Sequence, residues 1–145
     1  MGVIEKKRME IKFTLDGGAF TPERAHDTDA GFDLRSRDNT DIINGYVFNT
    51  GVHVEIPKGY VGYVQGRSGL NIKHDIICPT GVVDCGFTGA IRVKLYNMGN
   101  KPYSVNKGDK IAQLVIQPIA HAELVRVDSL EDTERGDNGF GSTGK

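Results

Sequence analysis

The chain has 145 residues, of which 38% are hydrophobic and 26% are charged, and its formal net charge is -1. This length fits one domain with a single core, and the charge argues against a general nucleic-acid binder, which is usually clearly basic. No apolar run approaches the length of a membrane span, and the N-terminus lacks the apolar core of a signal peptide. We therefore expect a cytoplasmic protein that has neither nucleic acid nor a membrane as a partner.

Short segments in which apolar and polar residues alternate run through the chain. A period of two is typical of half-buried strands, and turns rich in glycine separate the segments. The alternating segments are predicted to be strands at residues 9–15, 52–56 and 90–96, and further strands are predicted at residues 60–65, 111–117 and 122–127. The one helix expected is short, at residues 68–74. The sequence therefore predicts an all-β sandwich or barrel-like fold.

The last eleven residues, 135–145, differ from the rest because they contain four glycines and one large apolar residue, Phe140. Such a segment cannot build a core of its own. We expect a β domain over residues 1–134, followed by a flexible C-terminal arm. The two cysteines, Cys78 and Cys85, match neither a zinc nor a redox spacing, so we expect both to be reduced thiols.

Two segments carry side chains suited to a cation and to a phosphate. In residues 29–34, Asp29 and Asp33 would point to the same side of an extended chain and could hold the water shell of Mg²⁺, although a surface turn explains the same residues. In residues 66–70, Arg67 offers a planar fork of donors for phosphate oxygens. Ser68 adds a hydroxyl at a helix N-terminus, or else it caps that helix.

Two further segments suggest a general base and a closing loop. The pattern of residues 81–89 predicts a β-hairpin that holds Asp84 near Phe87. A carboxylate held there could act as general base toward a water, although Asp beside Gly is also a common turn former. In residues 135–145, Gly-Ser-Thr-Gly has the composition of a phosphate-binding loop, and Phe140 could stack on a nucleobase. A disordered C-terminus would have the same composition.

Taken together and in this order, five segments resemble the motifs of the trimeric dUTPase family. They are DAGFDL at 29–34, GRSGL at 66–70, GVVDCGFTG at 81–89, GDKIAQL at 108–114 and RGDNGFGSTG at 135–144. The resemblance implies a jelly-roll-like β-clip fold, assembled as a homotrimer with shared active sites. It also implies that the C-terminal motif of one subunit closes over a nucleotide held between the other two.

The resemblance further implies hydrolysis of dUTP to dUMP and pyrophosphate by attack of water on the α-phosphorus, which supplies dUMP for thymidylate synthesis and limits uracil in DNA. Asp84 matches the catalytic acid that activates the water, and Asp33 matches the acid that positions Mg²⁺ through water. The implied phosphate-binding residues are Arg67, Ser68, Gly69, Gln113, Arg135, Gly141, Ser142 and Thr143. The implied base- and sugar-binding residues are Cys78, Gly81, Val83, Asp84, Phe87, Ile91, Lys94 and Phe140.

Two matched positions depart from the family's pattern. Phe87 stands where a Tyr usually packs against the deoxyribose, and Cys78 stands where many bacterial members carry an Asn that contacts the base. The retained ring of Phe87 should still exclude a ribose 2′-hydroxyl. A thiol is a poor hydrogen-bond partner, so uracil recognition would depend on backbone groups of the 81–89 hairpin.

Two alternatives to dUTP hydrolysis belong to other classes of function. A dCTP deaminase shares the fold, but residues 66–70 lack the Ser-Ser-x-Ala-Arg character associated with that branch. Some phage members of the family are regulators that bind repressors, so a phage-encoded chain could have a regulatory protein partner. That role usually comes with an inserted segment, for which the spacing between motifs leaves little room, although a surface patch could serve.

Overall fold

A computed structural model of the protein describes residues 8–141. Over this range it contains strands and one short helix, which confirms the all-β class. In chain order they are β1 Lys12–Leu15, β2 Gly31–Arg35, β3 Thr40–Ile42, β4 Gly45–Asn49, β5 Val52–Glu55, β6 Tyr60–Gln65, α1 Ser68–His74, β7 Ile76–Ile77, β8 Gly81–Val83, β9 Arg92–Asn97, β10 Tyr103–Val105 and β11 Lys110–Pro118.

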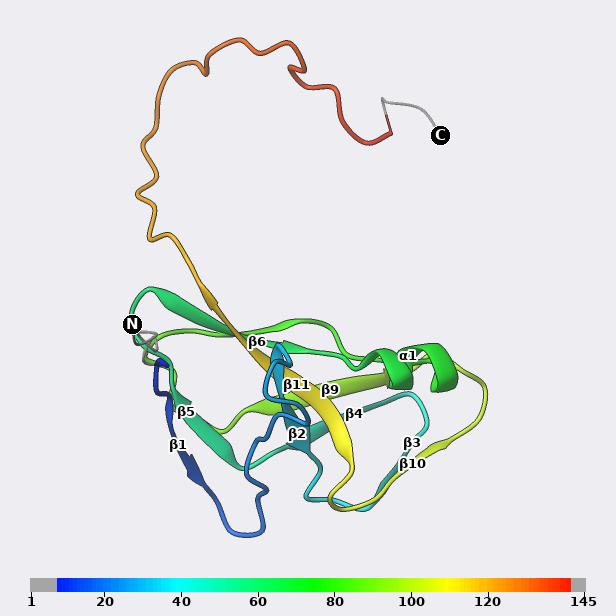
Figure 1. The fold of residues 1–145 in the computed structure, drawn as a ribbon. Helices are drawn as coiled ribbons and strands as arrows, with labels where there is room; N and C mark the ends of the chain where they lie inside the picture. The colour runs from blue at the N-terminus through cyan, green and yellow to red at the C-terminus, as the bar shows by residue number, and fades with distance from the viewer. Residues whose placement is uncertain (1–7, 142–145) are drawn as a thin grey trace, which may run out of the picture.

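Antiparallel sheets pack around one apolar core (Figure 1). The largest sheet has the order β2-β11-β6-β8, and a second sheet has the order β4-β9-β7. Two smaller pairs, β1-β5 and β10-β3, complete the body. The core takes residues from both larger sheets, such as Phe48, Val93, Ile111 and Leu114, each of which is buried. This arrangement confirms the jelly-roll-like expectation.

The local patterns located several elements correctly. The predicted strand at 60–65 and the predicted helix at 68–74 coincide with β6 and α1. In β9 the burial alternates strictly, with Val93, Leu95 and Asn97 inward. In β11 the pairing register with β2 shifts between Lys110 and Ala112. A β-bulge of this kind adds a residue to one strand and breaks the alternation, which explains why both Ile111 and Ala112 are buried.

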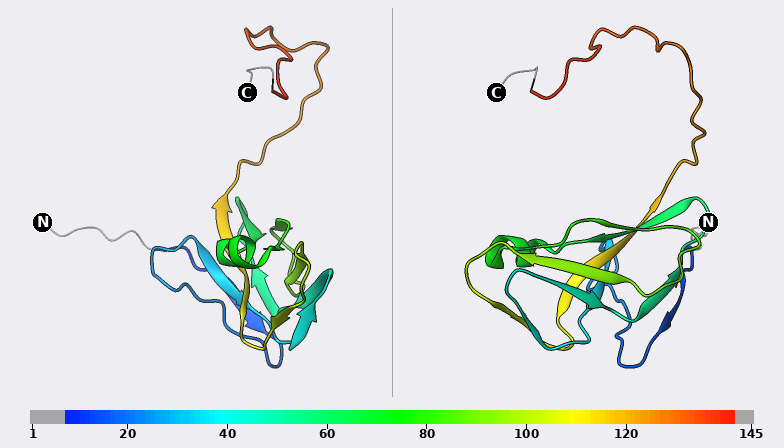
Figure 2. Two further views of the ribbon diagram at one scale, coloured as in Figure 1. Left: turned by 90° about the vertical axis from the view of Figure 1, so that its right-hand side faces the viewer. Right: turned by 180° about the vertical axis from the view of Figure 1, so that it is seen from behind.

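Two predictions about strands differ from the structure. The prediction of a strand at 122–127 is wrong for the single chain, because no helix or strand follows Pro118 up to residue 141. That segment runs away from the sheets in every view (Figure 2). Strand β1 forms as expected, but it is not half-buried, since all four of its residues are exposed. In both cases the apolar side chains do not pack against a second layer of structure within the described part of this chain.

Residues 8–141 include no helix that is both long and apolar enough to cross a membrane. Cys78 and Cys85 are both free thiols, as predicted. The division into a domain over residues 1–134 and an arm over 135–145 stays a prediction, and the chain leaves the sheets earlier, after Pro118.

Candidate active site

Three motifs that are distant in the sequence meet on the four-stranded sheet. Gln113 of β11 is paired with Asp33 of β2 on one side and with Gln65 of β6 on the other. Arg67 lies between the end of β6 and the start of α1, after Gly66. The sheet therefore brings an acid, an amide and a guanidinium together, although more than 30 positions separate them along the chain.

The Asp33 carboxylate organises the cations of this region. Its Oδ2 lies 3.1 Å from Lys110 Nζ, and its Oδ1 lies 3.8 Å from Arg67 Nε. The Asp33 side chain is only 15% exposed, so this pairing is partly shielded from solvent and holds both cations near the cavity described next. Lys110 was not among the predicted site residues. Its place in GDKIAQL, three residues before Gln113, was the signal that could have identified it.

A cavity of about 370 Å³ opens between α1, β7 and β11, and we call it the phosphate cavity. Its lining includes Arg67, Ser68 and Gln113, three of the predicted phosphate-binding residues. Gln113 Nε2 donates a hydrogen bond to the Gly66 carbonyl at 3.0 Å, which orients the amide. Gly69 lies on α1, outside this lining.

Ser68 does not act as the helix cap. The N-cap position belongs to Arg67, whose side chain makes no capping hydrogen bond, and Ser68 is the first helical residue. The alternative that Ser68 serves only as a cap is therefore wrong, and its hydroxyl lines the phosphate cavity instead.

Cys78 also lines the phosphate cavity, beside Gly66. Burial raises the pKa of its thiol above the ordinary value, so the thiol stays protonated and donates weakly to the Pro79 carbonyl at 3.6 Å. Cys78 lies apart from the other residues predicted to hold the base, and its contact with the base stays a prediction.

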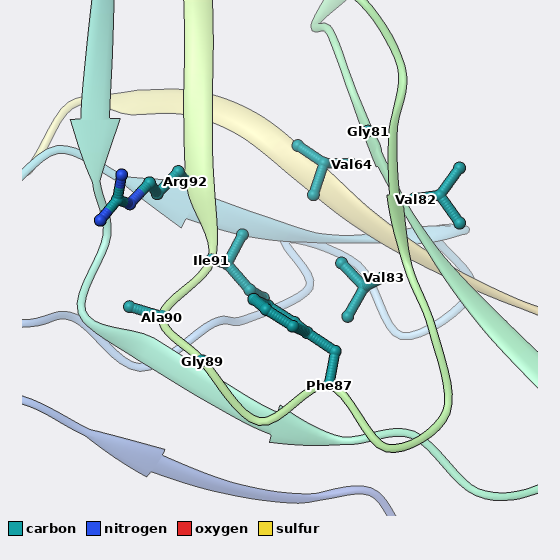
Figure 3. Close-up of a pocket in the computed structure, with 9 residues that line it drawn as sticks. All are labelled: Val64, Gly81, Val82, Val83, Phe87, Gly89, Ala90, Ile91 and Arg92. Atoms are coloured by element: carbon teal, nitrogen blue, oxygen red, sulfur yellow. The ribbon is translucent and has the colours of Figure 1, made fainter.

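A second cavity, of about 480 Å³, lies between β8 and the start of β9, and we call it the base cavity (Figure 3). Four predicted base- and sugar-binding residues line it: Gly81, Val83, Phe87 and Ile91. A Cβ at Gly89 would lie 2.7 Å from Phe87 Cζ, so only glycine lets the ring fold over the backbone there. An apolar recess bordered by backbone groups suits a flat base and its sugar.

Residues 84–89, which we call the Asp84 loop, connect β8 to the other side of the base cavity. The Phe87 amide donates to the Asp84 carbonyl at 3.1 Å, and Gly86 takes a φ of +94°, which closes a tight turn. The predicted β-hairpin is wrong, because β8 pairs with β6 whereas β9 pairs with β4 and β7. The loop therefore crosses from one sheet to the other.

Asp84 itself is exposed and lines neither cavity of the single chain. Lys94 is exposed on β9, with its Nζ 5.1 Å from the centre of the Tyr96 ring, and lies outside the base cavity. Arg92, which was not predicted, is among the residues that line that cavity.

The described part of the C-terminal motif lies away from the sheets (Figure 2) and lines neither cavity. Arg135 Nε donates to the Asn138 carbonyl at 2.7 Å, and Phe140 is fully exposed. Gly141 follows with a φ of +87°. Ser142 and Thr143 lie outside the described residues. The chain's own tail thus contributes to neither cavity as far as residue 141.

Comparison with known proteins agrees with this pattern of motifs. The family model described as dUTPase matches residues 19–144, which is most of the chain. The chain belongs to the dUTPase family. A deoxyuridine 5′-triphosphate nucleotidohydrolase of Tropheryma whipplei is 42% identical over 143 residues, covering 94% of this chain and 97% of that protein.

Two solved phage dUTPases share the fold. The dUTPase of Staphylococcus bacteriophage 80alpha, solved with dUPNHPP, aligns with a TM-score of 0.85 at 34% identity and covers 94% of this chain and 99% of its own. The dUTPase of phage phi11 of S. aureus, described with a structural Mg(II) ion, has a TM-score of 0.79 at 31% identity and covers 86% and 100%. The jelly-roll-like dUTPase fold is therefore shown for this chain.

The described residues form no complete magnesium site of their own, so an Mg²⁺ ion would have to be held mainly by a bound nucleotide. Within residues 8–141 there is no group of three His, Cys, Asp or Glu side chains that could enclose a metal. Mg²⁺ commonly uses one or two carboxylates together with substrate phosphates and water. Asp33 offers one carboxylate, and its neighbour Arg67 lines the phosphate cavity. A contact of Asp33 with Mg²⁺ through water stays a prediction.

Proposed function

We propose that this chain hydrolyses dUTP to dUMP and pyrophosphate at sites that three copies of the chain complete together. One observation carries the proposal. Residues of different motifs, which one reaction would need together, lie at separate places in the single chain. The phosphate cavity and the base cavity share no lining residue, and the described tail reaches neither. In an assembly of copies, the phosphate cavity of one copy, the base cavity of another and the tail of a third would meet around one nucleotide.

The segment after Pro118 supports an assembly of copies. Its large apolar side chains are exposed in the single chain, and they are Ile119, Leu124, Val125, Val127 and Leu130. The apolar residues at 122–127 suit a strand, yet an extended segment needs a partner to satisfy its backbone groups. We infer that this segment packs on a neighbouring copy in a homotrimer.

The proposed chemistry needs no covalent enzyme intermediate. Water attacks the α-phosphorus, its proton passes to the Asp84 carboxylate, and the bond from the α-phosphorus to the bridging oxygen breaks as pyrophosphate leaves. Arg67, Ser68 and Gln113 hold phosphate oxygens and offset the charge that builds on them. Mg²⁺, when bound to the nucleotide, adds positive charge at the phosphates. Asp33 would hold this ion through water.

Selectivity for a deoxyuridine nucleotide is assigned to the base cavity and the tail. The backbone around Gly81 and Val83 borders the cavity and offers donors and acceptors to the edge of a small base. The Phe87 ring would pack against the sugar, and Phe140 of another copy would stack on the base. Arg135, Gly141, Ser142 and Thr143 would close over the phosphates. Ordering the tail costs about 1–2 kcal/mol per residue, which its contacts must exceed.

The substitution Asp84→Asn tests the proposal. It keeps the shape of the side chain but removes the proton acceptor, so we expect turnover of dUTP to fall by about 10²- to 10⁴-fold. Binding of a non-hydrolysable dUTP analogue, measured by calorimetry, should change little. The matched control Asp75→Asn, at an exposed position outside both cavities, should keep normal turnover. Normal turnover by Asp84→Asn would refute the assignment of the base.

The substrate claim is tested by comparing dUTP with dCTP, dTTP and UTP in steady-state assays. We expect kcat/KM to be highest for dUTP, because the base cavity should exclude larger or differently hydrogen-bonded bases. Comparable turnover of all four nucleotides would contradict the selectivity, and ammonia release from dCTP would favour a deaminase instead.

A regulatory role is a second candidate, favoured by one comparison. The 80alpha structure is described in terms of phage dUTPases that control transfer of virulence genes by a G protein-like mechanism. If this chain acts similarly, a protein partner should co-purify with it in a manner that a dUTP analogue changes. A partner bound equally with and without the analogue would argue against a nucleotide-controlled role.

A further inference from the structure

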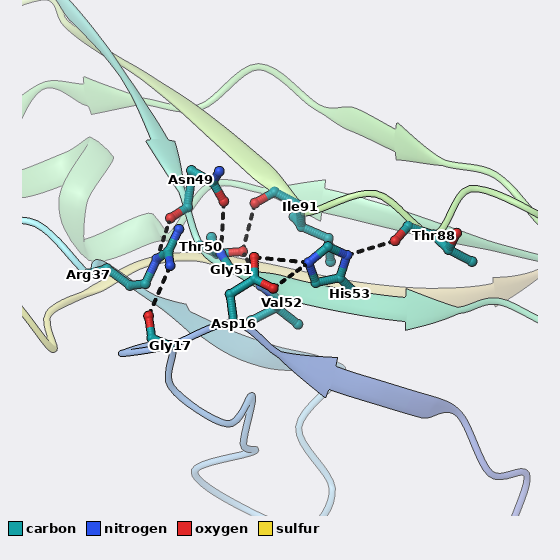
Figure 4. Close-up of polar contacts among 10 residues, drawn as sticks. All are labelled: Asp16, Gly17, Arg37, Asn49, Thr50, Gly51, Val52, His53, Thr88 and Ile91. Carbon is teal, nitrogen blue, oxygen red and sulfur yellow. Dashed lines mark hydrogen bonds and ion pairs between the residues drawn. The ribbon is translucent and has the colours of Figure 1, made fainter.

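His53 on β5 contacts two acceptors from opposite sides of its ring (Figure 4). Its Nδ1 lies 2.7 Å from the Thr88 carbonyl oxygen, and its Nε2 lies 3.0 Å from both carboxylate oxygens of Asp16. Thr88 belongs to the Asp84 loop. One imidazole therefore joins the edge pair β1-β5 to the loop that carries the proposed general base.

The contact with His53 anchors a loop that is otherwise held only at its ends. In residues 8–141, the other hydrogen bond recorded for the Asp84 loop is internal, from the Phe87 amide to the Asp84 carbonyl. The next fixed point is Ile91, whose amide donates to the Val52 carbonyl at 2.8 Å and whose carbonyl accepts from Thr50 Oγ1 at 2.7 Å. The hydrogen bond to His53 is thus the one described hydrogen bond that ties the Asp84 loop to another element.

The two partners of His53 can only accept hydrogen bonds, because one is a carbonyl and the other a carboxylate. An imidazolium donates from both nitrogens, whereas a neutral imidazole carries one N–H. Deprotonation must therefore cost one of the two contacts. The carboxylate is the stronger acceptor, so the remaining proton should stay on Nε2 and the Thr88 carbonyl should then face a lone pair.

The two hydrogen-bond partners of His53 favour its protonated form. The hydrogen bond to Thr88 and then the one to Asp16 raise the pKa of His53 above its ordinary value of 6.5, and the charge of Arg37 opposes this in part. Arg37 is fixed by donating to the carbonyls of Asn49 and Gly17. Lys12 and Glu55 line a shallow cavity beside the ring. The side chain is 27% exposed, so it can exchange protons with solvent.

We propose that His53 is a positioning residue, whose imidazolium holds the Thr88 carbonyl and so fixes the Asp84 loop for catalysis, and whose deprotonation releases the loop. The inference deepens the proposed function and depends on it for its catalytic consequence. The direction in pH follows from the raised pKa. The tether is complete below about pH 6.5, the ordinary value, and is lost as the pH rises through the higher value of the folded protein.

Amide hydrogen exchange in the ligand-free, full-length protein tests the tether independently of activity. We compare wild type with His53→Ala, which removes both contacts, and with His53→Asn, whose amide can donate near the Nδ1 position without titrating. At about pH 6, the amides of residues 85–89 should exchange more slowly in wild type than in His53→Ala, and at about pH 9 the two should agree. Equal exchange at the lower pH would overturn the proposal.

Steady-state kinetics with dUTP test the consequence for catalysis. The wild-type KM should rise by about 3- to 10-fold as the pH passes the raised pKa of His53, which is the size of one lost hydrogen bond. His53→Ala should show the higher KM at every pH. His53→Asn should show no rise of KM with pH, and Asp16→Asn should shift the rise of KM to lower pH. The matched control His74→Asn, at the end of α1 against Tyr103, should retain the wild-type step.

The two measurements separate the failure of the inference from the failure of the proposed function. If wild type does not hydrolyse dUTP, the proposed function fails, whereas the exchange data still decide whether His53 holds the loop. If wild type is active and its KM step persists unchanged in His53→Ala, the positioning role of His53 is refuted.

Discussion

Gly31, at the start of β2, shows how one missing side chain shapes the phosphate cavity. A Cβ on Gly31 would lie 2.9 Å from the Cβ of Gln113, closer than packed side chains allow. The Gln113 side chain therefore lies over Gly31, and its amide reaches the Gly66 carbonyl. Gly31 of the DAGFDL motif thus leaves the space that the side chain of Gln113 in the GDKIAQL motif occupies.

The substitution Gly31→Ala should displace the Gln113 amide from its place in the phosphate cavity. We expect the KM for dUTP to rise by about 3- to 10-fold, because one oriented hydrogen-bonding group is lost from phosphate binding. The matched control is Gly17→Ala, where no atom lies within 4 Å of the added Cβ, and its KM should be unchanged. An unaltered KM in Gly31→Ala would show that Gln113 does not hold the phosphates.

At the scale of elements, helix α1 orients Arg67 and Ser68, and its end is set by Asp75. This residue is the C-cap and has a left-handed backbone with φ of 57°. Its amide satisfies carbonyls of the last turn at Asn71 and Leu70. An L-residue is strained in this conformation, whereas glycine adopts it readily.

The substitution Asp75→Gly should therefore stabilise the protein, by up to about 1 kcal/mol. Asp75 is exposed, so little packing is lost with its side chain. Asp75→Ala, which keeps the Cβ and loses the tolerance of Asp for this conformation, should instead be slightly destabilising. Urea unfolding at fixed protein concentration measures both variants, and the same sign for both would contradict the strain argument.

At the scale of the whole molecule, the chain after Pro118 serves two separate purposes in our proposal. Residues 119–134 carry most of the exposed apolar side chains of the segment and would bind a neighbouring copy. Residues 135–145 are rich in glycine and would close over the nucleotide. The two parts should therefore be separable by truncation.

Deleting residues 135–145 should leave the mass of the assembly unchanged while turnover of dUTP is largely lost, because the phosphate contacts of the tail disappear. Deleting residues 119–145 should also dissociate the trimer, since the apolar segment is removed. Light scattering coupled to size exclusion and a turnover assay measure both effects. If the shorter deletion dissociates the assembly, the division of roles between the two parts is wrong.

The sequence by itself determined the strands and the helix whose signals are local. The alternation that predicted β9 and the residue types that predicted β6 act between neighbours along the chain, so these elements formed where expected. The family was predicted from five short motifs in a fixed order, because their residue types together suit one reaction. Asp33, Arg67 and Gln113 were predicted from these motifs to share a site, and the structure brings the three residues close together.

Only the tertiary structure decided which elements meet. The pairing of β8 with β6 rather than β9, the ion pair of Lys110 with Asp33, and the bond from His53 to Thr88 all join residues remote in sequence. Such contacts depend on the energy of the whole packed arrangement, for which no short window of sequence carries a signal. The same holds for the segment at 122–127, whose strand pattern requires a partner that a single chain does not supply.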